Sequence, residues 1–569
     1  LQANADRAPP GISWPKVTVR GIDDVPIVVL TLSPEPQVAD RWSDRELRQV
    51  AERLRTEMLK VPDVGLTFLV GGRAEAIRIV PDPGRLAAHG VSLGALAEGV
   101  RAAAQQFPLG PVRDGGESTL VVAGAGIDGA AALERVILRS VAGAPVLLSD
   151  VATVEQGPAE AQARAWRMTP AEDGAWALAP SVSIAVAKRS GANAVTVSKS
   201  VVERLESMQG QLVPPGLHVA VTRNYGETAN EKANELIFHL ALATVSIVIL
   251  VGLAVGWREA AVTAIVIPTT ILLTLFASNL MGYTINRVSL FALIFSIGIL
   301  VDDAIVMIEN IARHWAMDDG RSRIAAAIDG VAEVGNPTVV ATLTVVAALL
   351  PMLFVSGLMG PYMAPIPINA SAAMIFSFFV AVVIAPWLMV RFSRVALFGT
   401  GHHGGEAHGG RLGALYERVA RPLIARRRTA GMFLAAVGVA TLIAGSMFYW
   451  KAVTVKLLPF DNKSEVQIVL DMPPGTSLEA TQRTLLDLAR VAGQLPEVTA
   501  MDVHAGTAAP FNFNGLVRHY FLRREAFQGD VMLTLQHRSD RSRSSHEVAL
   551  SLREALKAVP LPDGASLGV

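Results

Sequence analysis

The sequence predicts an α-helical polytopic membrane protein that also carries α+β soluble regions. Three observations predict this fold class. The middle of the chain holds apolar stretches that are long enough to cross a bilayer, which takes about 20 residues. The segments before and after it are rich in charges and alternate strand-like and helix-like patterns. One apolar stretch, 289–310, carries two adjacent carboxylates, Asp302 and Asp303.

Composition limits the classes of function. A length of 569 residues suggests several domains. The formal net charge is zero, which argues against a nucleic-acid partner, because such a partner requires a basic face. Without cysteine there is neither a disulfide framework nor a thiolate metal site. The chain begins with Leu1 rather than Met, so we expect a piece of a longer protein, cut at both ends.

Strand–helix–strand patterns recur in the two soluble regions. In the first region they are 25–32, 44–59 and 64–70, followed by 181–187, 195–208 and 217–222. In the second they are 466–471, 477–494 and 498–504, followed by 531–536, 545–557 and 565–569. The segments that follow the first expected helix of each region also match, since Val61-Pro62-Asp63-Val64 corresponds to Leu495-Pro496-Glu497-Val498. The two regions are therefore expected to be repeats built from βαβ units.

Between the soluble regions, six segments are expected to cross the membrane: 240–255, 260–286, 289–310, two within 335–390, and 429–450. The stretch 335–390 has no charged residue and is too long for one span, so we expect a break near Gly360 and Pro361. Proline inside a span is tolerated where neighbouring helices satisfy the backbone.

Arginines set the expected orientation. Between the fifth and sixth spans lie Arg391, Arg394, Arg411, Arg418, Arg421, Arg426, Arg427 and Arg428. Only Glu406 and Glu417 oppose them, so the positive-inside rule places this segment in the cytoplasm. Six crossings then place both soluble regions on the outer, periplasmic side.

The same basic segment contains two further patterns. Leu412, Leu415, Tyr416, Val419 and Leu423 recur at helical spacing opposite arginines, which predicts an interfacial amphipathic helix. Three histidines, His402, His403 and His408, lie among glycines. A metal site there is conceivable, but a solvated linker is favoured because no periodic scaffold fixes ligand geometry. We therefore expect no metal site and no cofactor.

The paired aspartates suit proton binding. An ionised Asp at the bilayer centre costs roughly 2.5–3.5 kcal/mol on insertion scales, so two adjacent ones require a reason. Burial and a neighbouring like charge both favour the protonated form of a carboxylic acid. Ser289, Ser296 and Asn310 lie at seven-residue spacing from Asp303, near the same face. The alternative is a neutral, hydrogen-bonded pair that only packs helices together.

Glu309 lies seven residues after Asp302, on the same face and near the expected cytoplasmic end of the helix. It is a candidate proton exit group. An interfacial carboxylate in contact with water explains it equally well.

The run from Gly298 to Asn310, GILVDDAIVMIEN, closely resembles the fourth transmembrane helix of resistance–nodulation–division (RND) efflux permeases. In that family the paired aspartates are the proton-translocation site. The resemblance implies a partial RND transporter fold with repeated ferredoxin-like porter subdomains. It further implies a secondary active transporter rather than an enzyme, in the bacterial inner membrane. Its cationic partner for the aspartates, a lysine of the second repeat, would lie outside this chain.

The resemblance also assigns domains and partners. The expected domains are the end of a first porter subdomain (1–24), a second porter subdomain (25–80 and 166–233), a docking insert (81–165), five spans (234–392), a cytoplasmic linker (393–428), a sixth span (429–451) and a third porter subdomain (452–569). The implied partners are protons, a small-molecule substrate, a periplasmic adaptor protein and an outer-membrane channel. The permease itself would be a homotrimer.

A loop in the second soluble region is a candidate substrate pocket. Phe511, Phe513 and Tyr520 lie among amides and glycine, which suits an adaptable apolar pocket. By resemblance, drug-exporting RND permeases keep a glycine-rich, phenylalanine-bearing switch loop at this place, although the spacing here departs from that pattern. The alternative is that the rings pack the subdomain core.

Three other functions fit the sequence less well than drug efflux. An intramembrane aspartyl protease needs two facing aspartates that share a proton, and adjacent residues on one helix diverge. A non-transporting scaffold or sensor leaves the buried carboxylates unexplained. Heavy-metal cation efflux is the alternative within transport, but that branch typically shows one aspartate here and Met pairs in the porter region.

Overall fold

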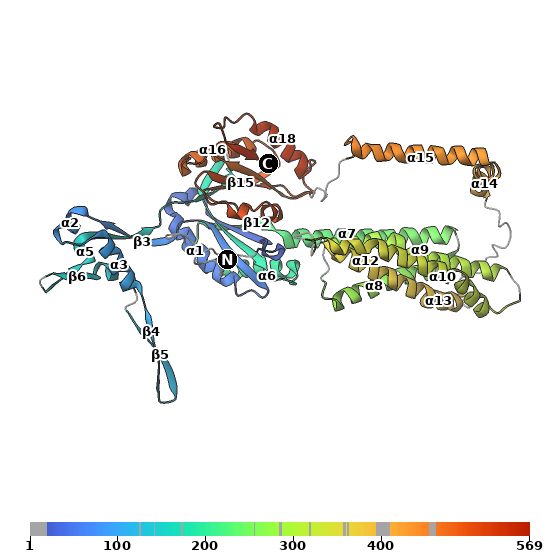
Figure 1. Cartoon of the computed structure of the whole chain (residues 1–569), viewed down its shortest axis with the longest axis horizontal. Helices are drawn as coiled ribbons and strands as arrows, with labels where there is room; N and C mark the ends of the chain where they lie inside the picture. Colours follow the sequence, from blue (N-terminus) through green and yellow to red (C-terminus); the bar gives the residue numbers. More distant parts are fainter. Residues whose placement is uncertain are drawn as a thin grey trace, which may run out of the picture. The chain divides into compact units, whose positions relative to one another are not determined.

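The computed structural model (Figure 1) describes residues 20–569, apart from 125–126, 142, 172–173, 255, 284–286, 318–319, 357–359, 361–362, 394–409 and 454–461. The chain divides into two compact units. A soluble unit comprises the residues up to Glu227 together with Asn462–Val569, and a helical unit comprises Thr228–Asp461. Most of the predicted end of a first porter subdomain, 1–24, lies outside the described residues, as do His402, His403 and His408.

The first sheet of the soluble unit is a βαββαβ arrangement. Its elements are β1 (Val28–Pro34), α1 (Asp44–Met58), β2 (Val64–Gly71), β11 (Val182–Lys188), α6 (Ala194–Met208) and β12 (Leu217–Asn224), with short 3-10 turns at η2 (Ile22–Asp24) and η3 (Pro36–Arg41). The strand order is β12-β1-β11-β2, and all neighbours are antiparallel. This is a ferredoxin-like order. Leu47 and Leu54 of α1 and Val201 of α6 are buried against the strands in one apolar core.

The expected insert folds separately between β2 and β11. It contains β3 (Glu75–Pro81), α2 (Pro83–Ala88), α3 (Leu93–Ala104), β4 (Phe107–Asp114), β5 (Glu117–Ala123), α4 (Ala130–Glu134), β6 (Ile137–Val141), β7 (Ala144–Leu147), α5 (Leu148–Val151) and β8 (Ala152–Pro158). The antiparallel pair β3–β8 forms its base. Leu96, Leu148 and Val151 belong to a core of its own. Figure 1 shows β4 and β5 as a long hairpin arm that extends from the insert.

The second sheet repeats the same order and adds two strands. Its elements are β13 (Glu465–Asp471), α16 (Leu478–Ala492), β14 (Val498–Ala505), α17 (Phe513–Val517), η6 (Tyr520–Leu522), β15 (Gln528–Leu535), α18 (Ser545–Leu556) and β16 (Ser566–Gly568), joined by β9 (Arg164–Pro170) and β10 (Trp176–Pro180). The order is β10-β9-β14-β15-β13-β16. Its last four strands repeat the order of the first sheet, as the sequence repeat predicted. Residues of α16 and α18 form its core with β13, β14 and β15.

Strand pairing corrects one predicted boundary. The sequence analysis assigned 166–233 as a whole to the second porter subdomain. In the structure β9 pairs with β14, so residues 164–180 join the second sheet instead. Strand periodicity alone does not identify which sheet a strand joins, and this pairing spans more than 300 residues of sequence.

The helical unit contains the apolar helices. They are α7 (Tyr225–Ala254), α8 (Trp257–Leu280), α9 (Arg287–Ala316), α10 (Arg323–Leu349), η4 (Leu350–Phe354), α12 (Pro365–Phe379), the π-helical turn η5 (Val380–Ile384), α13 (Ala385–Phe392), α14 (Gly410–Ala425) and α15 (Arg427–Tyr449). The predicted break of the stretch 335–390 lies between Phe354 and Pro365. Helix α7 begins at Tyr225, ahead of the predicted domain start at residue 234, because its polar first turns lie outside the apolar run.

Among the described residues, five helical segments are long and apolar enough to cross a membrane: Tyr225–Leu253, Trp257–Leu280, Arg323–Phe354, Pro365–Phe392 and Arg427–Tyr449. Helix α9, which carries the aspartates, is not among them but packs against α8, α10 and α12. Strand β9 precedes the helical unit in the chain and β14 follows it, yet the two lie in one sheet. The six predicted crossings, with α9 among them, stay a prediction.

Candidate functional site

The two aspartates occupy different environments on α9. Asp303 is buried, whereas Asp302 is exposed on the described bundle. Ser289, Ser296 and Asn310, which the seven-residue spacing placed near the same face, are buried as well. Successive helical residues point about 100° apart, so a buried and an exposed neighbour are expected. The structure therefore presents Asp303 to the interior of the bundle.

The Asp303 carboxyl group lies beside the charge of Asp302 and contacts two hydroxyl groups. Thr342 of α10 and Ser377 of α12 provide its hydrogen-bond partners. Oδ2 of Asp303 is buried without a partner among the described residues. Ala304, Met307 and the other apolar residues of α9 pack against α8, η5 and α13 nearby. A carboxyl group held by two hydroxyls in an apolar bundle can bind and release a proton, because neither partner carries a charge that fixes its state.

The end of α9 beyond Asp303 carries a polar cluster that the sequence analysis missed. Asn310 donates to the carbonyl oxygen of Gly330 at 2.7 Å and to Oε2 of Glu333 at 3.4 Å. Arg313 also donates to Glu333, and a ring nitrogen of His314 lies 2.7 Å from it. The predicted exit residue Glu309 is exposed. Glu333 lies in the next helix, so its proximity to Asn310 cannot be read from periodicity on α9 alone.

The three predicted pocket residues have different surroundings. Phe511 is buried in an apolar cluster with Val25 and Leu516. Its ring stacks on Phe68 of β2, with centroids 5.6 Å apart, and tilts against Phe521. This position joins the two sheets of the soluble unit. It also agrees with the alternative that the Phe511 ring packs a core.

Phe513 and Tyr520 are half-buried. The hydroxyl of Tyr520 accepts a hydrogen bond from Arg518 at 3.3 Å, and the guanidinium of Arg523 lies 5.6 Å from the centre of its ring. The structure thus brings Phe511 together with Phe68 and Phe521.

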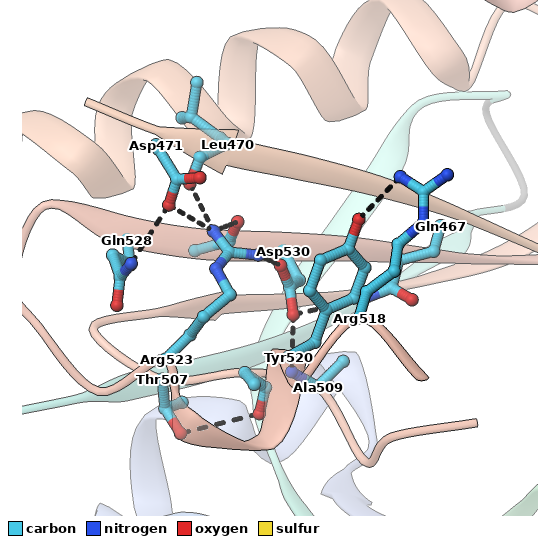
Figure 2. Close-up of polar contacts among 12 residues, drawn as sticks. Gln467, Leu470, Asp471, Thr507, Ala509, Arg518, Tyr520, Arg523, Gln528 and Asp530 are labelled. Carbon is cyan, nitrogen blue, oxygen red and sulfur yellow. Dashed lines mark hydrogen bonds and ion pairs between the residues drawn. The ribbon is translucent and has the colours of Figure 1, made fainter. Parts of the chain in front are cut away.

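One carboxylate anchors both ends of this loop (Figure 2). Asp530 of β15 is completely buried. It accepts hydrogen bonds from the backbone N–H of Ala509 at 2.8 Å, from Gln467 at 3.2 Å and from Arg523. Arg523 also donates to the Asp471 carboxylate at 2.9 Å. Asp530 therefore fixes both ends of the loop from Ala509 to Arg523, which carries the aromatic rings.

A polar seam lies where the two sheets of the soluble unit face each other. Val29, Thr31, Ser183, Thr222 and Arg223 of the first sheet line a cavity of about 10 Å³ together with Glu465, Asp502, His504, Pro510 and Met532. That volume suits about one water molecule. Arg167 donates to both oxygens of Asp502, at 2.9 and 3.1 Å. Most side chains that meet here are polar, in contrast with the apolar cores on the outer faces of the sheets.

His504 is the unpaired group of the seam. It is completely buried, and neither ring nitrogen has a hydrogen-bond partner among the described residues. Burial lowers its pKa to about 4. His504 was assigned only to a strand by the sequence analysis, and nothing in the alternation of β14 distinguishes it from an exposed histidine.

Comparisons with known proteins agree with this architecture. A model of the AcrB/AcrD/AcrF family matches residues 1–565. The multidrug resistance protein MdtC of Pantoea ananatis is 30% identical over 368 residues, which cover 64% of this chain and 34% of that protein. MdtC of Pectobacterium atrosepticum is 27% identical over 398 residues (69% and 37%), and MdtC of Edwardsiella ictaluri is 29% identical over 397 residues (69% and 37%).

The chain thus spans about a third of the length of these curated relatives. The resemblance of the aspartate helix to RND permeases is confirmed, because the family model covers nearly the whole chain. The chain belongs to the AcrB/AcrD/AcrF family.

Proposed function

We propose that the full-length protein is a proton-driven permease that exports hydrophobic or amphiphilic compounds from the periplasm or the inner membrane. Asp303 carries this proposal. Its carboxyl group is buried in an apolar helix bundle with only hydroxyl partners, which suits a group that changes its protonation state. Asp302 is the adjacent member of the pair and is exposed on the described bundle.

As a member of this family with five candidate spans, the chain is an inner-membrane protein. Two relatives of the chain are multidrug resistance proteins, which supports drugs rather than metal cations as substrates. The aromatic cluster of Phe511, Phe68 and Phe521 would provide apolar contacts to such compounds if the two sheets move apart.

The proposed pump includes a homotrimer of the permease, a periplasmic adaptor and an outer-membrane channel. The hairpin arm supports a protein partner. Strands β4 and β5 pair only with each other among the described strands. Phe107, Leu109, Val112 and Val122 of the arm are exposed. A lone two-stranded hairpin is marginally stable in water, so cover by another chain would stabilise it.

Reconstitution of the full-length protein in proteoliposomes tests the function. Efflux of a fluorescent amphiphilic dye should require an imposed proton gradient and should stop when a protonophore collapses it. A panel of divalent cations, measured in the same vesicles, should show no gradient-dependent movement. Gradient-dependent cation transport would favour metal efflux, and the absence of any transport would favour a scaffold or sensor.

A further inference from the structure

A buried ion pair connects the two sheets of the soluble unit. Arg223 lies at the end of β12, and Glu465 is the first residue of β13. Nε of Arg223 donates to Oε2 of Glu465 at 2.8 Å. The two side chains are 3% and 10% exposed, so water screens the pair little.

The same pair also holds the candidate pocket loop. A second guanidinium nitrogen of Arg223, Nη1, donates to the carbonyl oxygen of Phe511 at 3.0 Å. The side-chain amide of Asn512 donates to Oε1 of Glu465 at 3.4 Å. The backbone of Phe511, whose ring packs between the sheets, is therefore fixed to this ion pair rather than to β12 alone.

The first turn of α7 is also attached to the ion pair. Tyr225 is the first residue of α7, and its hydroxyl donates to Oε1 of Glu465. Its backbone N–H donates to the carbonyl oxygen of Ile27 at 2.8 Å. The Tyr225 ring also lies beside the guanidinium of Arg223 and the ammonium of Lys463, at 5.2 and 5.4 Å. Helix α7 continues from this point to Ala254 as one of the candidate spans.

Burying the charges of Arg223 and Glu465 lowers the stability of the fold, whereas their mutual attraction raises it. Burial alone would raise the pKa of Glu465, but the charges of Arg223 and Lys463 and the Tyr225 hydrogen bond hold it below its ordinary value. Glu465 thus stays ionised, and an ionised buried pair is often no more stabilising than apolar residues of the same size. Unlike apolar residues, the ion pair fixes the geometry between β13, the Phe511 loop and the first turn of α7.

We propose that Glu465 is a positioning residue for export: with Arg223 it ties the first turn of α7 to the Phe511 loop. A displacement of α7 in the membrane would then move the loop. This inference rests on the proposed function, because it assumes that protons drive a movement of the helical unit. It assigns no proton transfer to Glu465.

The test uses the full-length protein in proteoliposomes and removes both charges at once, as Arg223→Met/Glu465→Leu. Removing both partners avoids an unpaired buried charge, which would destabilise the fold by itself. We expect dye binding without a gradient, and the KM for export, to stay near parental values. The maximal rate of gradient-driven export should fall about tenfold, which is within the range of measured coupling effects.

A matched control is Arg543→Met/Glu497→Leu. This ion pair makes two contacts, of 2.6 and 2.7 Å, but among the contacts of the described residues it touches neither α7 nor the Phe511 loop. It should export at the parental rate. Parental export by Arg223→Met/Glu465→Leu, in protein that folds and binds dye, would overturn the proposal and leave the ion pair a structural element.

If the double variant unfolds, Tyr225→Phe decides the question, since it keeps the ion pair and removes only the hydroxyl donor. A reduced maximal rate at unchanged KM supports the proposal, and an unchanged rate overturns it. The proposed function fails separately: parental protein that exports without a proton gradient refutes it, whatever the variants at residues 223, 225 and 465 do.

Discussion

Buried carboxylates occur in both units, but their partners differ. In the soluble unit Asp530 pairs with Arg523, and Asp502 with Arg167. In the helical unit Asp303 contacts hydroxyl groups, and no Lys or Arg of the described chain forms an ion pair with it. Burial raises the pKa of the Asp530 carboxyl group to about 6 and that of Asp502 above its usual value, whereas Arg523 and Arg167 act in the opposite direction and fix the position of each carboxylate. A carboxyl group among hydroxyls remains free to gain or lose a proton. The comparison separates structural acids from the candidate proton carrier.

Removing an arginine should show the structural role most strongly. Arg523→Ala leaves the buried Asp530 carboxylate without its cationic partner and also removes the ion-pair partner of Asp471. We expect a loss of about 3–5 kcal/mol in the free energy of unfolding, the usual effect of breaking a buried pair. Chemical denaturation of the purified full-length protein in detergent measures this loss.

Arg490→Ala is the control, because Arg490 and Asp487 form an exposed pair within α16. Its effect should stay within about 1 kcal/mol. Equal effects of the two substitutions would show that the buried Asp530 contacts contribute nothing special.

The aromatic rings of the loop allow a second comparison. Phe511→Ala should destabilise the protein by about 3–5 kcal/mol, because the ring is buried against Phe68 and Phe521. Phe513→Ala, at a half-buried position, should have a smaller effect on stability. Denaturation midpoints and dye-transport profiles should be measured together. A changed substrate profile for Phe511→Ala at parental stability would assign the ring to the pocket rather than to the core.

The buried imidazole of His504 has no hydrogen-bond partner among the described residues. Its pKa of about 4 lies below the ordinary 6.5, so the neutral form is favoured in the fold. The stability that depends on this form is present above about pH 6.5 and is lost as the pH falls towards 4. The expected loss is about 3 kcal/mol, from 1.36 kcal/mol for each pH unit between the two values.

The His504→Gln variant should therefore show a weaker dependence of the denaturation midpoint on pH between 6.5 and 4 than the parent. His537→Gln is the control, because His537 is exposed. An unchanged slope for His504→Gln would contradict the burial of a neutral ring at this position.

The smallest expected effect concerns the hydroxyls beside Asp303. Thr342→Val keeps the shape of the side chain and removes one hydrogen-bond partner of the carboxyl group. A single hydrogen bond contributes about 1 kcal/mol, so export should slow by less than about tenfold. Thr344→Val, on the exposed face of the same helix, should leave the rate unchanged. Loss of all export in Thr342→Val would mean that this hydroxyl is itself essential to proton transfer.

Local patterns in the sequence predicted most of the fold. Alternation in β13 and the helical spacing of α1 and α16 reflect how each element buries one face, and this burial is encoded in neighbouring residues. The hydropathy of α8 and α10 similarly identified spans. The pairing of β9 with β14 was missed because it depends on which surfaces meet in three dimensions.

Some residues of the candidate site could likewise be predicted from the sequence, and others could not. Asp303 was found because a carboxylate in an apolar run has no local explanation. The polar cluster at Glu333, the anchor at Asp530 and the ion pair of Glu465 were missed, because charged residues near element ends are common in sequence. Only their burial and their partners from distant segments distinguish them.

Proton-coupled transport by Asp303→Asn tests the central claim most directly. Asn preserves the size of the side chain but cannot bind and release a proton, so the helix should insert and the protein should still bind dye. With full-length protein in proteoliposomes, dye-dependent proton flux and gradient-driven export should both be abolished. Asp329→Asn, which changes an acid paired with Arg321 at the end of α10, should retain both activities. Parental proton flux and export in Asp303→Asn would contradict the account.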